Sequence, residues 1–148
     1  MSAGVWVLVA VLVAATAFGV YRRLTDGRIR GVDSVADTAD RPVDPARLVT
    51  AQDIGQPLGD RATLVQFSTA FCQPCRPTRR VLAEVAGMVD GVRHVDVDAE
   101  SHLDLARRLQ VVRTPTVLVL DGDGNVVRRA TGVPRREDVI AALGEAIP

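Results

Sequence analysis

Residues 1–21 carry no charged side chain, and this run restricts the chain more than any other part of its sequence. From Gly4 to Tyr21 the side chains are almost all apolar. A helix of about 20 residues rises about 30 Å, which matches the thickness of the hydrocarbon core of a bilayer. Trp6 and Tyr21 lie near the two ends of the run, where amphipathic rings favour the membrane interface. We therefore predict a single-pass transmembrane anchor over residues 3–21.

Two other interpretations of this run are weaker. A cleaved signal peptide would explain the small residues 15–17, but no Lys or Arg precedes the run, and the run is longer than a usual signal core. A core helix of a soluble domain would need a polar side that faces water, and this segment has none. An uncleaved anchor therefore fits best.

The charges after the run indicate on which side of the membrane the rest of the chain lies. Four arginines follow it closely: Arg22, Arg23, Arg28 and Arg30. Because positively charged flanks remain in the cytoplasm, we predict that everything after the anchor is cytoplasmic. An extracytoplasmic domain is the alternative.

Composition and charge exclude several classes of protein. The chain has 148 residues, 47% of them apolar, which allows one domain with a sizeable core plus a short appendage. Eighteen basic residues balance eighteen acidic ones, so we expect no nucleic-acid partner held by bulk charge. All the basic residues are Arg, which excludes a Schiff-base lysine and a phosphate-loop lysine. Two Cys and two His leave few ligands for a metal ion.

Beyond the anchor the chain divides into a linker and one domain. Residues 22–45 lack hydrophobic periodicity and end in a segment with two prolines, so we predict a flexible linker there. From residue 46 to 148, short β-branched runs alternate with amphipathic segments. Strands are predicted over residues 62–67, 92–97, 116–120 and 126–130, and helices over 72–89, 101–109 (with Ser101 as N-cap) and 137–147. This order predicts an α/β domain with a mixed central sheet flanked by helices.

The most informative motif is Cys72-Gln73-Pro74-Cys75, at the junction of a predicted strand and a predicted helix. Two cysteines at this spacing on a first helical turn bring their sulfur atoms close enough to form a disulfide. Unpaired N–H groups at a helix N-terminus favour negative charge, so we expect a lowered pKa for the Cys72 thiol, which makes it a good nucleophile and leaving group. Cys75, one turn deeper, is expected to be shielded and to resolve a mixed disulfide. Pro74 stiffens the loop between them.

Other roles for the two cysteines fit less well. A structural disulfide that closes so small a ring gains at most about 2 kcal/mol of chain entropy. A zinc site would need Cys72, Cys75, His94 and His102, whose spacing does not match the usual zinc-binding patterns. Haem attachment would need His directly after the second cysteine, where Arg76 stands. We therefore expect disulfide exchange without a metal or an organic cofactor.

Three segments of the chain together resemble the thioredoxin family. They are the strand Leu64–Phe67 with the following Phe71–Arg76, the segment Val111–Gly124, and Thr131–Val133 before the last helix. The resemblance covers residues 48–147 and implies a thioredoxin fold with a dithiol–disulfide active site.

The resemblance also implies that Pro115 is a cis-proline facing the two cysteines. Such a bond leaves the backbone of Thr114 free to pair with an incoming extended peptide. From the residues alone, a trans-proline that opens a strand would be the simpler interpretation. The predicted substrate-binding residues are Phe71, Gln73, Pro74, Thr114 and Pro115.

The chain departs from the family pattern near the cysteines. Members often carry a buried acid six residues before the first cysteine, which can accept the proton of the deeper one. This chain has Gln66 there, which cannot take a proton, so we expect resolution by Cys75 to be slower or to use water. His94, on a predicted strand, is a candidate proton relay, or else a half-buried strand residue. Gln66 and His94 are thus the candidate residues of a proton path.

We therefore predict a membrane-tethered thiol–disulfide oxidoreductase that exchanges disulfides with protein substrates through Cys72 and Cys75. Its electrons would pass to or from a reductase or membrane partner that the sequence does not identify. One alternative is a peptide-binding or redox-sensing module without turnover. Another is an extracytoplasmic thiol enzyme for the maturation of secreted or haem proteins. The direction of the reaction, reduction or oxidation, stays open.

Overall fold

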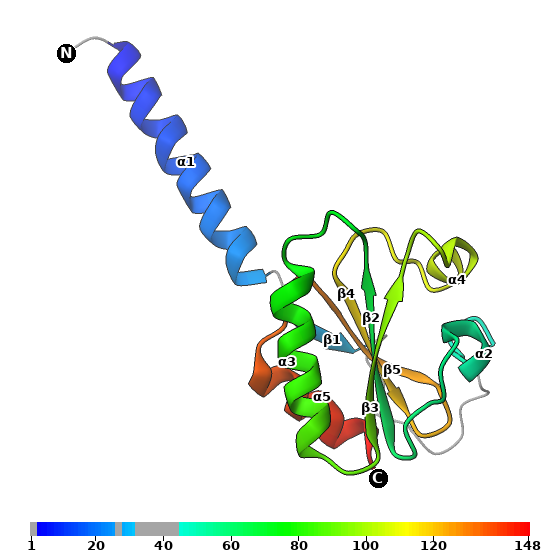
Figure 1. Ribbon diagram of the computed structural model, residues 1–148. Coiled ribbons are helices and arrows are strands. Elements are labelled where there is room, and N and C mark those ends of the chain that lie inside the picture. Colours follow the sequence, from blue (N-terminus) through cyan, green and yellow to red (C-terminus); the bar gives the residue numbers. More distant parts are fainter. Residues whose placement is uncertain (1–2, 26–27, 32–44) are drawn as a thin grey trace.

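The computed structural model describes residues 3–25, 28–31 and 45–148 (Figure 1). It begins with helix α1 (Ala3–Thr25). The elements that follow are β1 (Ile29–Gly31), α2 (Ala51–Ile54), β2 (Ala62–Ser68), α3 (Cys75–Met88), β3 (Val92–Asp98), α4 (Leu103–Arg108), β4 (Thr116–Asp121), β5 (Val126–Thr131) and α5 (Arg136–Ala146). The four strands and the last helix predicted from the sequence are confirmed to within one residue at each end.

The strands form one mixed sheet with the order β1-β5-β4-β2-β3. β2 and β3 pair in parallel, and every other neighbouring pair is antiparallel. A parallel pair needs a crossover connection, which α3 supplies. β2 lies inside the sheet with both faces covered, and all 7 of its residues are buried. Its C-terminal end leads directly to the Cys72–Cys75 motif.

Helices cover both faces of the sheet (Figure 1). On one face, Leu64 of β2 shares an apolar cluster with Leu82 of α3 and Val139 of α5. On the other face, Phe67 of β2 shares a second cluster with Leu105 of α4. Burial of these two layers fixes the register of β2, because a shift by one residue would exchange the faces of its side chains. The α/β architecture predicted from the sequence is confirmed.

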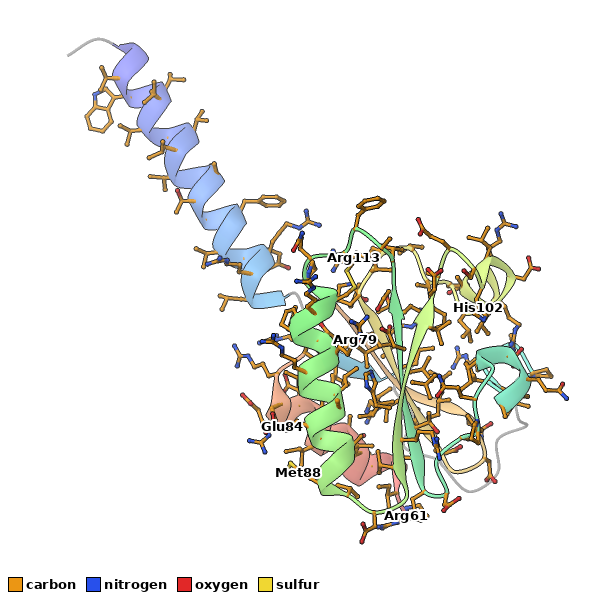
Figure 2. The ribbon with its side chains drawn as sticks, in the orientation of Figure 1. Arg61, Arg79, Glu84, Met88, His102 and Arg113 are labelled. Carbon is orange, nitrogen blue, oxygen red and sulfur yellow. A yellow bond between two sulfur atoms is a disulfide. The ribbon has the colours of Figure 1, made fainter. Side chains whose placement is uncertain are left out.

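Helix α1 has the length and composition of a membrane span. An 18-residue window within Gly4–Leu24 has a mean hydropathy of 2.2, and none of that window is buried in the structure (Figure 2). The Thr16 hydroxyl donates to the Leu12 carbonyl at 2.7 Å, so this polar group has a partner within the helix itself. The helix ends at Thr25, later than the anchor predicted from the sequence.

Part of the segment predicted to be a linker has regular structure. Residues 22–25 belong to α1, and Ile29–Gly31 form β1, which pairs with β5. Ile29 lies opposite Ala130 and packs against the apolar cluster beneath α5. A strand of 3 residues is too short to show a periodic pattern, which is why the sequence does not reveal it. The other predicted linker residues, 26–27 and 32–44, lie outside the described part of the chain.

Two helix starts differ from the prediction. α3 begins at Cys75 rather than at residue 72, because Pro74 is its N-cap and a turn precedes it. α4 begins after His102, whereas the sequence predicts Ser101 as the N-cap. The Ser101 hydroxyl instead donates to the Asp98 carboxylate at 2.5 Å, an acceptor three residues earlier that competes for it.

Candidate dithiol active site

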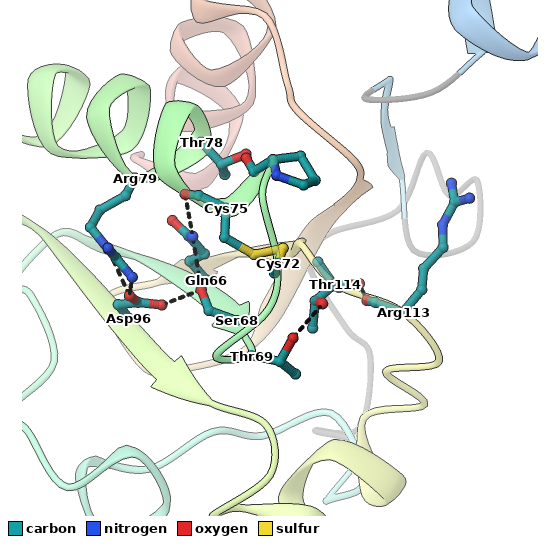
Figure 3. Close-up of a disulfide and its surroundings, with 12 residues drawn as sticks. Gln66, Ser68, Thr69, Cys72, Cys75, Thr78, Arg79, Asp96, Arg113 and Thr114 are labelled. Atoms are coloured by element: carbon teal, nitrogen blue, oxygen red, sulfur yellow. Dashed lines mark hydrogen bonds and ion pairs between the residues drawn. A yellow bond between two sulfur atoms is a disulfide. The ribbon is translucent and has the colours of Figure 1, made fainter.

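The two cysteines of the motif are joined by a disulfide at the start of α3 (Figure 3). Their sulfur atoms lie 2.03 Å apart and their Cα atoms 5.4 Å apart. Two successive turns connect β2 to the helix. The Cys72 N–H donates to the Thr69 carbonyl and the Cys75 N–H to the Cys72 carbonyl, each at 3.2 Å. These turns carry both cysteines to the end of the sheet.

The two cysteines differ in their exposure. Cys75, the first residue of α3, is 3% exposed. Cys72 is partly exposed, and the preceding Phe71 is 92% exposed. Gln73 and Pro74, between the cysteines, are also exposed. A reacting sulfur from another molecule can therefore approach Cys72, whereas the fold shields Cys75.

The loop that faces the disulfide carries a cis-proline. The Thr114–Pro115 peptide bond is cis, as the resemblance implies, and Pro115 is buried. The Pro115 carbonyl accepts the Gly132 N–H at 2.8 Å, which ties this loop to the chain after β5. The hydroxyls of Thr69 and Thr114 lie 3.3 Å apart, within hydrogen-bond distance (Figure 3). This contact joins the turn before Cys72 to the cis-proline loop, so the structure brings the two predicted segments together.

Gln66 lies beneath the disulfide in a buried polar network. Its side chain is fully buried, and its Nε2 donates to the Ser68 hydroxyl at 2.9 Å and to the Cys75 carbonyl at 3.0 Å. The Ser68 hydroxyl donates in turn to Asp96 Oδ1 at 2.5 Å. Arg79 of α3 forms an ion pair with Asp96 Oδ2 (Figure 3). Gln66 Oε1 has no hydrogen-bond partner among the described residues.

This network gives Gln66 a role in positioning α3, since its amide holds the carbonyl of the first helical residue. Ser68, Asp96 and Arg79 were not among the site residues predicted from the sequence. Ser68 follows Gln66 by two residues on β2, and Asp96 lies directly opposite Gln66 in the parallel ladder. Strand alternation therefore places the side chains of Gln66, Ser68 and Asp96 on one face of the sheet. The pairing of Gln66 with Asp96 depends on the register of β2 against β3, and this register is a tertiary property that the sequence pattern does not reveal.

His94 lies on the same strand as Asp96, two residues earlier and opposite Leu64. Its side chain is largely buried, and its Nε2 has no partner among the described residues. Burial lowers the pKa of His94, the Asp96 carboxylate opposes this shift, and Arg79 reinforces it. The neutral imidazole is therefore favoured. The ladder places His94 further from the disulfide than Asp96, and a proton-relay role for it stays a prediction.

The arrangement can perform sulfur exchange, because a reachable sulfur and a shielded one are already joined. Within the ranges that the structure describes, no three or more His, Cys, Asp or Glu side chains lie close enough together to hold a metal ion. His102 Nδ1 instead lies 3.0 Å from the Asp98 carbonyl.

Comparison with known sequences identifies the same region of the chain. The thioredoxin family model matches residues 50–145, about two thirds of the chain. A thioredoxin of Mycolicibacterium smegmatis is 33% identical over 90 residues, which cover 59% of this chain and 80% of that protein. A thioredoxin of Staphylococcus epidermidis is 29% identical over 96 residues, which cover 64% of this chain and 91% of that protein.

Solved structures agree with the sequence comparison. Chloroplastic thioredoxin z superposes with a TM-score of 0.52 and 27% identity over 59% of this chain and 79% of that one. The thioredoxin of Fasciola hepatica superposes with a TM-score of 0.52 and 23% identity over 60% of this chain and 83% of that one. The folded domain therefore has the thioredoxin fold. With the family model, the relatives and the Cys72–Cys75 disulfide in agreement, the chain belongs to the thioredoxin family.

Proposed function

We propose that this protein is a membrane-anchored thiol–disulfide oxidoreductase that acts on protein substrates. In the reducing direction, the Cys72 thiolate attacks a substrate disulfide, and one substrate sulfur leaves as a thiolate that takes up a proton. Cys75 then loses its proton and attacks Cys72 Sγ, which releases the second substrate thiol. The two electrons of the dithiol pass to the substrate, and the protein is left with the Cys72–Cys75 disulfide. The oxidising direction is the reverse of these steps.

The unequal exposure of the two cysteines carries this proposal. A mixed disulfide can form only at a sulfur that a second protein can reach, and Cys72 is partly exposed. Resolution requires a second sulfur that is close but protected from other partners, and Cys75 is 3% exposed. A purely structural disulfide has no need of an exposed half, and so small a ring contributes little to stability.

The cis-proline loop is the proposed site of substrate docking. Among the described residues, no backbone hydrogen bond outside the regular elements uses the N–H or carbonyl of Thr114. We propose that these two groups pair with an extended peptide laid across the loop. Phe71 and Val112, 92% and 91% exposed, are apolar side chains on the two loops next to the disulfide. We assign Phe71, Gln73, Pro74, Thr114 and Pro115 to substrate contact.

We further propose that α1 holds the domain at a membrane and that the domain lies on the cytoplasmic side. The arginines that follow the apolar run support this orientation, since basic flanks remain in the cytoplasm. A reporter fused to the C-terminus tests it, because reporter activity outside the cytoplasm would overturn the orientation. The electron partner is then a cytoplasmic thiol–disulfide reductase or a membrane-bound one.

The proposal is tested by insulin reduction and by trapping. The full chain in nonionic detergent should accelerate the reduction of insulin by dithiothreitol. Cys75→Ser should accumulate mixed disulfides with protein substrates, visible as adducts that dithiothreitol removes, whereas Cys72→Ser should form none. If the wild type is active and Cys75→Ser forms no adducts, the two-cysteine mechanism is wrong. Absence of any insulin reduction would instead favour a binding or redox-sensing module, for which the non-titratable Gln66 is the supporting observation.

A further inference from the structure

A pocket lies on the side of the sheet that carries α4, and nothing in the proposed function uses it. Its volume is about 200 Å³. It lies where the end of α4, strand β5 and the chain just before α2 meet. The described residues that line it are Ala46, Arg47, Arg108, Leu109, Gln110, Val126 and Arg129. None of them carries a negative charge, and three of them are arginines.

Arg108 and Arg129 are held in place by contacts with the protein. Arg108 Nη1 donates to the Leu48 carbonyl at 2.6 Å, and its Nη2 lies 2.8 Å from Asp53 Oδ1. Arg129 Nη2 donates to the carbonyl of Leu109, the C-cap residue of α4. Because a guanidinium has five N–H donors, these contacts orient each group without using all of its donors.

The charged form of Arg129 is disfavoured in this pocket. Burial lowers the pKa of Arg129, and the nearby Arg47 guanidinium lowers it further. Arg129 Nε is buried and has no hydrogen-bond partner among the described residues. Asp53 pairs with Arg108, but it does not line the pocket. An anion in the pocket would relieve the repulsion between Arg47 and Arg129.

The volume of the pocket and the geometry of its guanidinium donors indicate which kind of ligand it can bind. Since one water occupies about 30 Å³ in the liquid, the pocket has room for about six waters, or for one tetrahedral oxyanion with part of its hydration shell. Guanidinium groups match phosphate oxygens in shape as well as in charge, and several of them favour a dianion over a single carboxylate.

We propose that this pocket binds a phosphate group, as inorganic phosphate or as the head of a small phosphorylated molecule. The ligand would bridge Arg129 of β5, Arg108 at the end of α4, and Arg47. It would thereby tie the sheet to the start of the loop that runs from Gln110 to the cis-proline. The inference does not depend on the proposed redox function, because none of these residues belongs to the dithiol site.

The direct test is a calorimetric titration of the full chain, in nonionic detergent, with inorganic phosphate at constant ionic strength. Saturable binding is expected, together with a rise in melting temperature that sodium chloride of equal ionic strength does not produce. Arg129→Gln and Arg47→Gln should each weaken phosphate binding about tenfold, since each removes a charge-assisted contact. A titration without saturable heat would overturn the proposal.

Arg128→Gln is the matched control. Arg128 precedes Arg129 on β5, but it pairs with Glu145 of α5 on the opposite face of the sheet. Its substitution should change the phosphate affinity less than about twofold, because only screened long-range charge is lost. Equal weakening by Arg128→Gln and Arg129→Gln would show a response to net charge and would contradict the site. If Arg129→Gln does not fold, the comparison of Arg47→Gln with Arg128→Gln decides.

A second arm identifies the source of the phosphate group. The same titration is made with the full chain in nanodiscs of phosphatidylcholine, with and without phosphatidylglycerol. If the pocket takes a lipid headgroup, phosphatidylglycerol should weaken the binding of free phosphate in the wild type. If the ligand is a free phosphate, the two lipid compositions should give the same affinity. Arg128→Gln should follow the wild type in both lipids.

Discussion

The segment from β2 to α3 has a buried side and an open side, and the contrast between them explains how one short motif can hold two different sulfurs. On the buried side, Phe67 is fully enclosed and Cys75 contacts the amide of Gln66 through its carbonyl. On the open side, Phe71 is almost fully exposed and Cys72 is partly exposed. Only two residues lie between the cysteines in the chain, yet Cys75 belongs to the interior and Cys72 to the surface.

The comparison teaches that position relative to the start of α3 decides the role of each cysteine. Cys75 is the first helical residue and shares the burial of the helix, whereas Cys72 lies in the turn ahead of it. The buried side is also where the chain departs from the family pattern, since the Gln66 amide stands where members often have a buried acid, and the Asp96 carboxylate lies opposite Gln66 on β3. Changes on the two sides should therefore affect different properties of the protein.

The largest difference in stability is expected between alanine variants of Phe67 and Phe71, the two phenylalanines near the site. Phe67→Ala removes a fully buried ring from the core between the sheet and α4, and should lower the free energy of unfolding by about 3–5 kcal/mol. Phe71→Ala should change it by less than about 0.5 kcal/mol, because the ring is exposed. Urea denaturation of the full chain in detergent measures both. Similar losses for the two variants would refute the division into two sides.

Two ion pairs provide the next comparison. Asp96→Ala breaks the ion pair with Arg79 and leaves the Ser68 hydroxyl without its acceptor beneath α3. It should lower the free energy of unfolding by about 2 kcal/mol. Glu145→Ala breaks an exposed pair with Arg128 and should cost less than about 1 kcal/mol. Denaturation midpoints at one pH give both values. An equal and small cost would mean that the polar network contributes no more than a surface pair.

The pH dependence of stability tests the burial of His94. Its pKa in the folded protein lies below the ordinary value of 6.5, so the unfolded chain binds a proton first as the pH falls. The free energy of unfolding should therefore fall as the pH drops through about 6.5, and His94→Leu should reduce this loss. Asp53 and Asp98 also have lowered pKa values, but they act only as the pH falls through about 3.8 and below. An unchanged profile in His94→Leu would place the titration elsewhere.

The smallest effect is expected on the open side. Phe71→Ala should raise the KM for a protein disulfide a few-fold and leave kcat almost unchanged, because an exposed ring contributes contact area to the substrate rather than to the sulfur chemistry. Steady-state insulin reduction measures the two constants. A fall in kcat with unchanged KM would show that Phe71 acts on the reacting sulfurs, and would blur the contrast between the two sides.

The parts of this molecule that the sequence predicts are local ones. The apolar run, the spacing of Cys72 and Cys75, and the segment around Pro115 each lie within a few neighbouring residues, and the alternating strands follow from side-chain periodicity. The network of Ser68, Asp96 and Arg79 depends on the register of two strands and on the packing of a helix, which periodicity does not determine. The same holds for strand β1 and for the arginine pocket, which join segments far apart in the chain.

The most direct test of the account is the rate at which the two thiols of the reduced full chain react with iodoacetamide, followed for each cysteine by mass spectrometry. Cys72 should be modified at least about tenfold faster than Cys75 near neutral pH, because Cys72 is partly exposed whereas Cys75 is 3% exposed. Unfolding in urea should abolish the difference. Equal rates in the folded protein, or faster modification of Cys75, would contradict the assignment of Cys72 as the attacking sulfur and Cys75 as the resolving one.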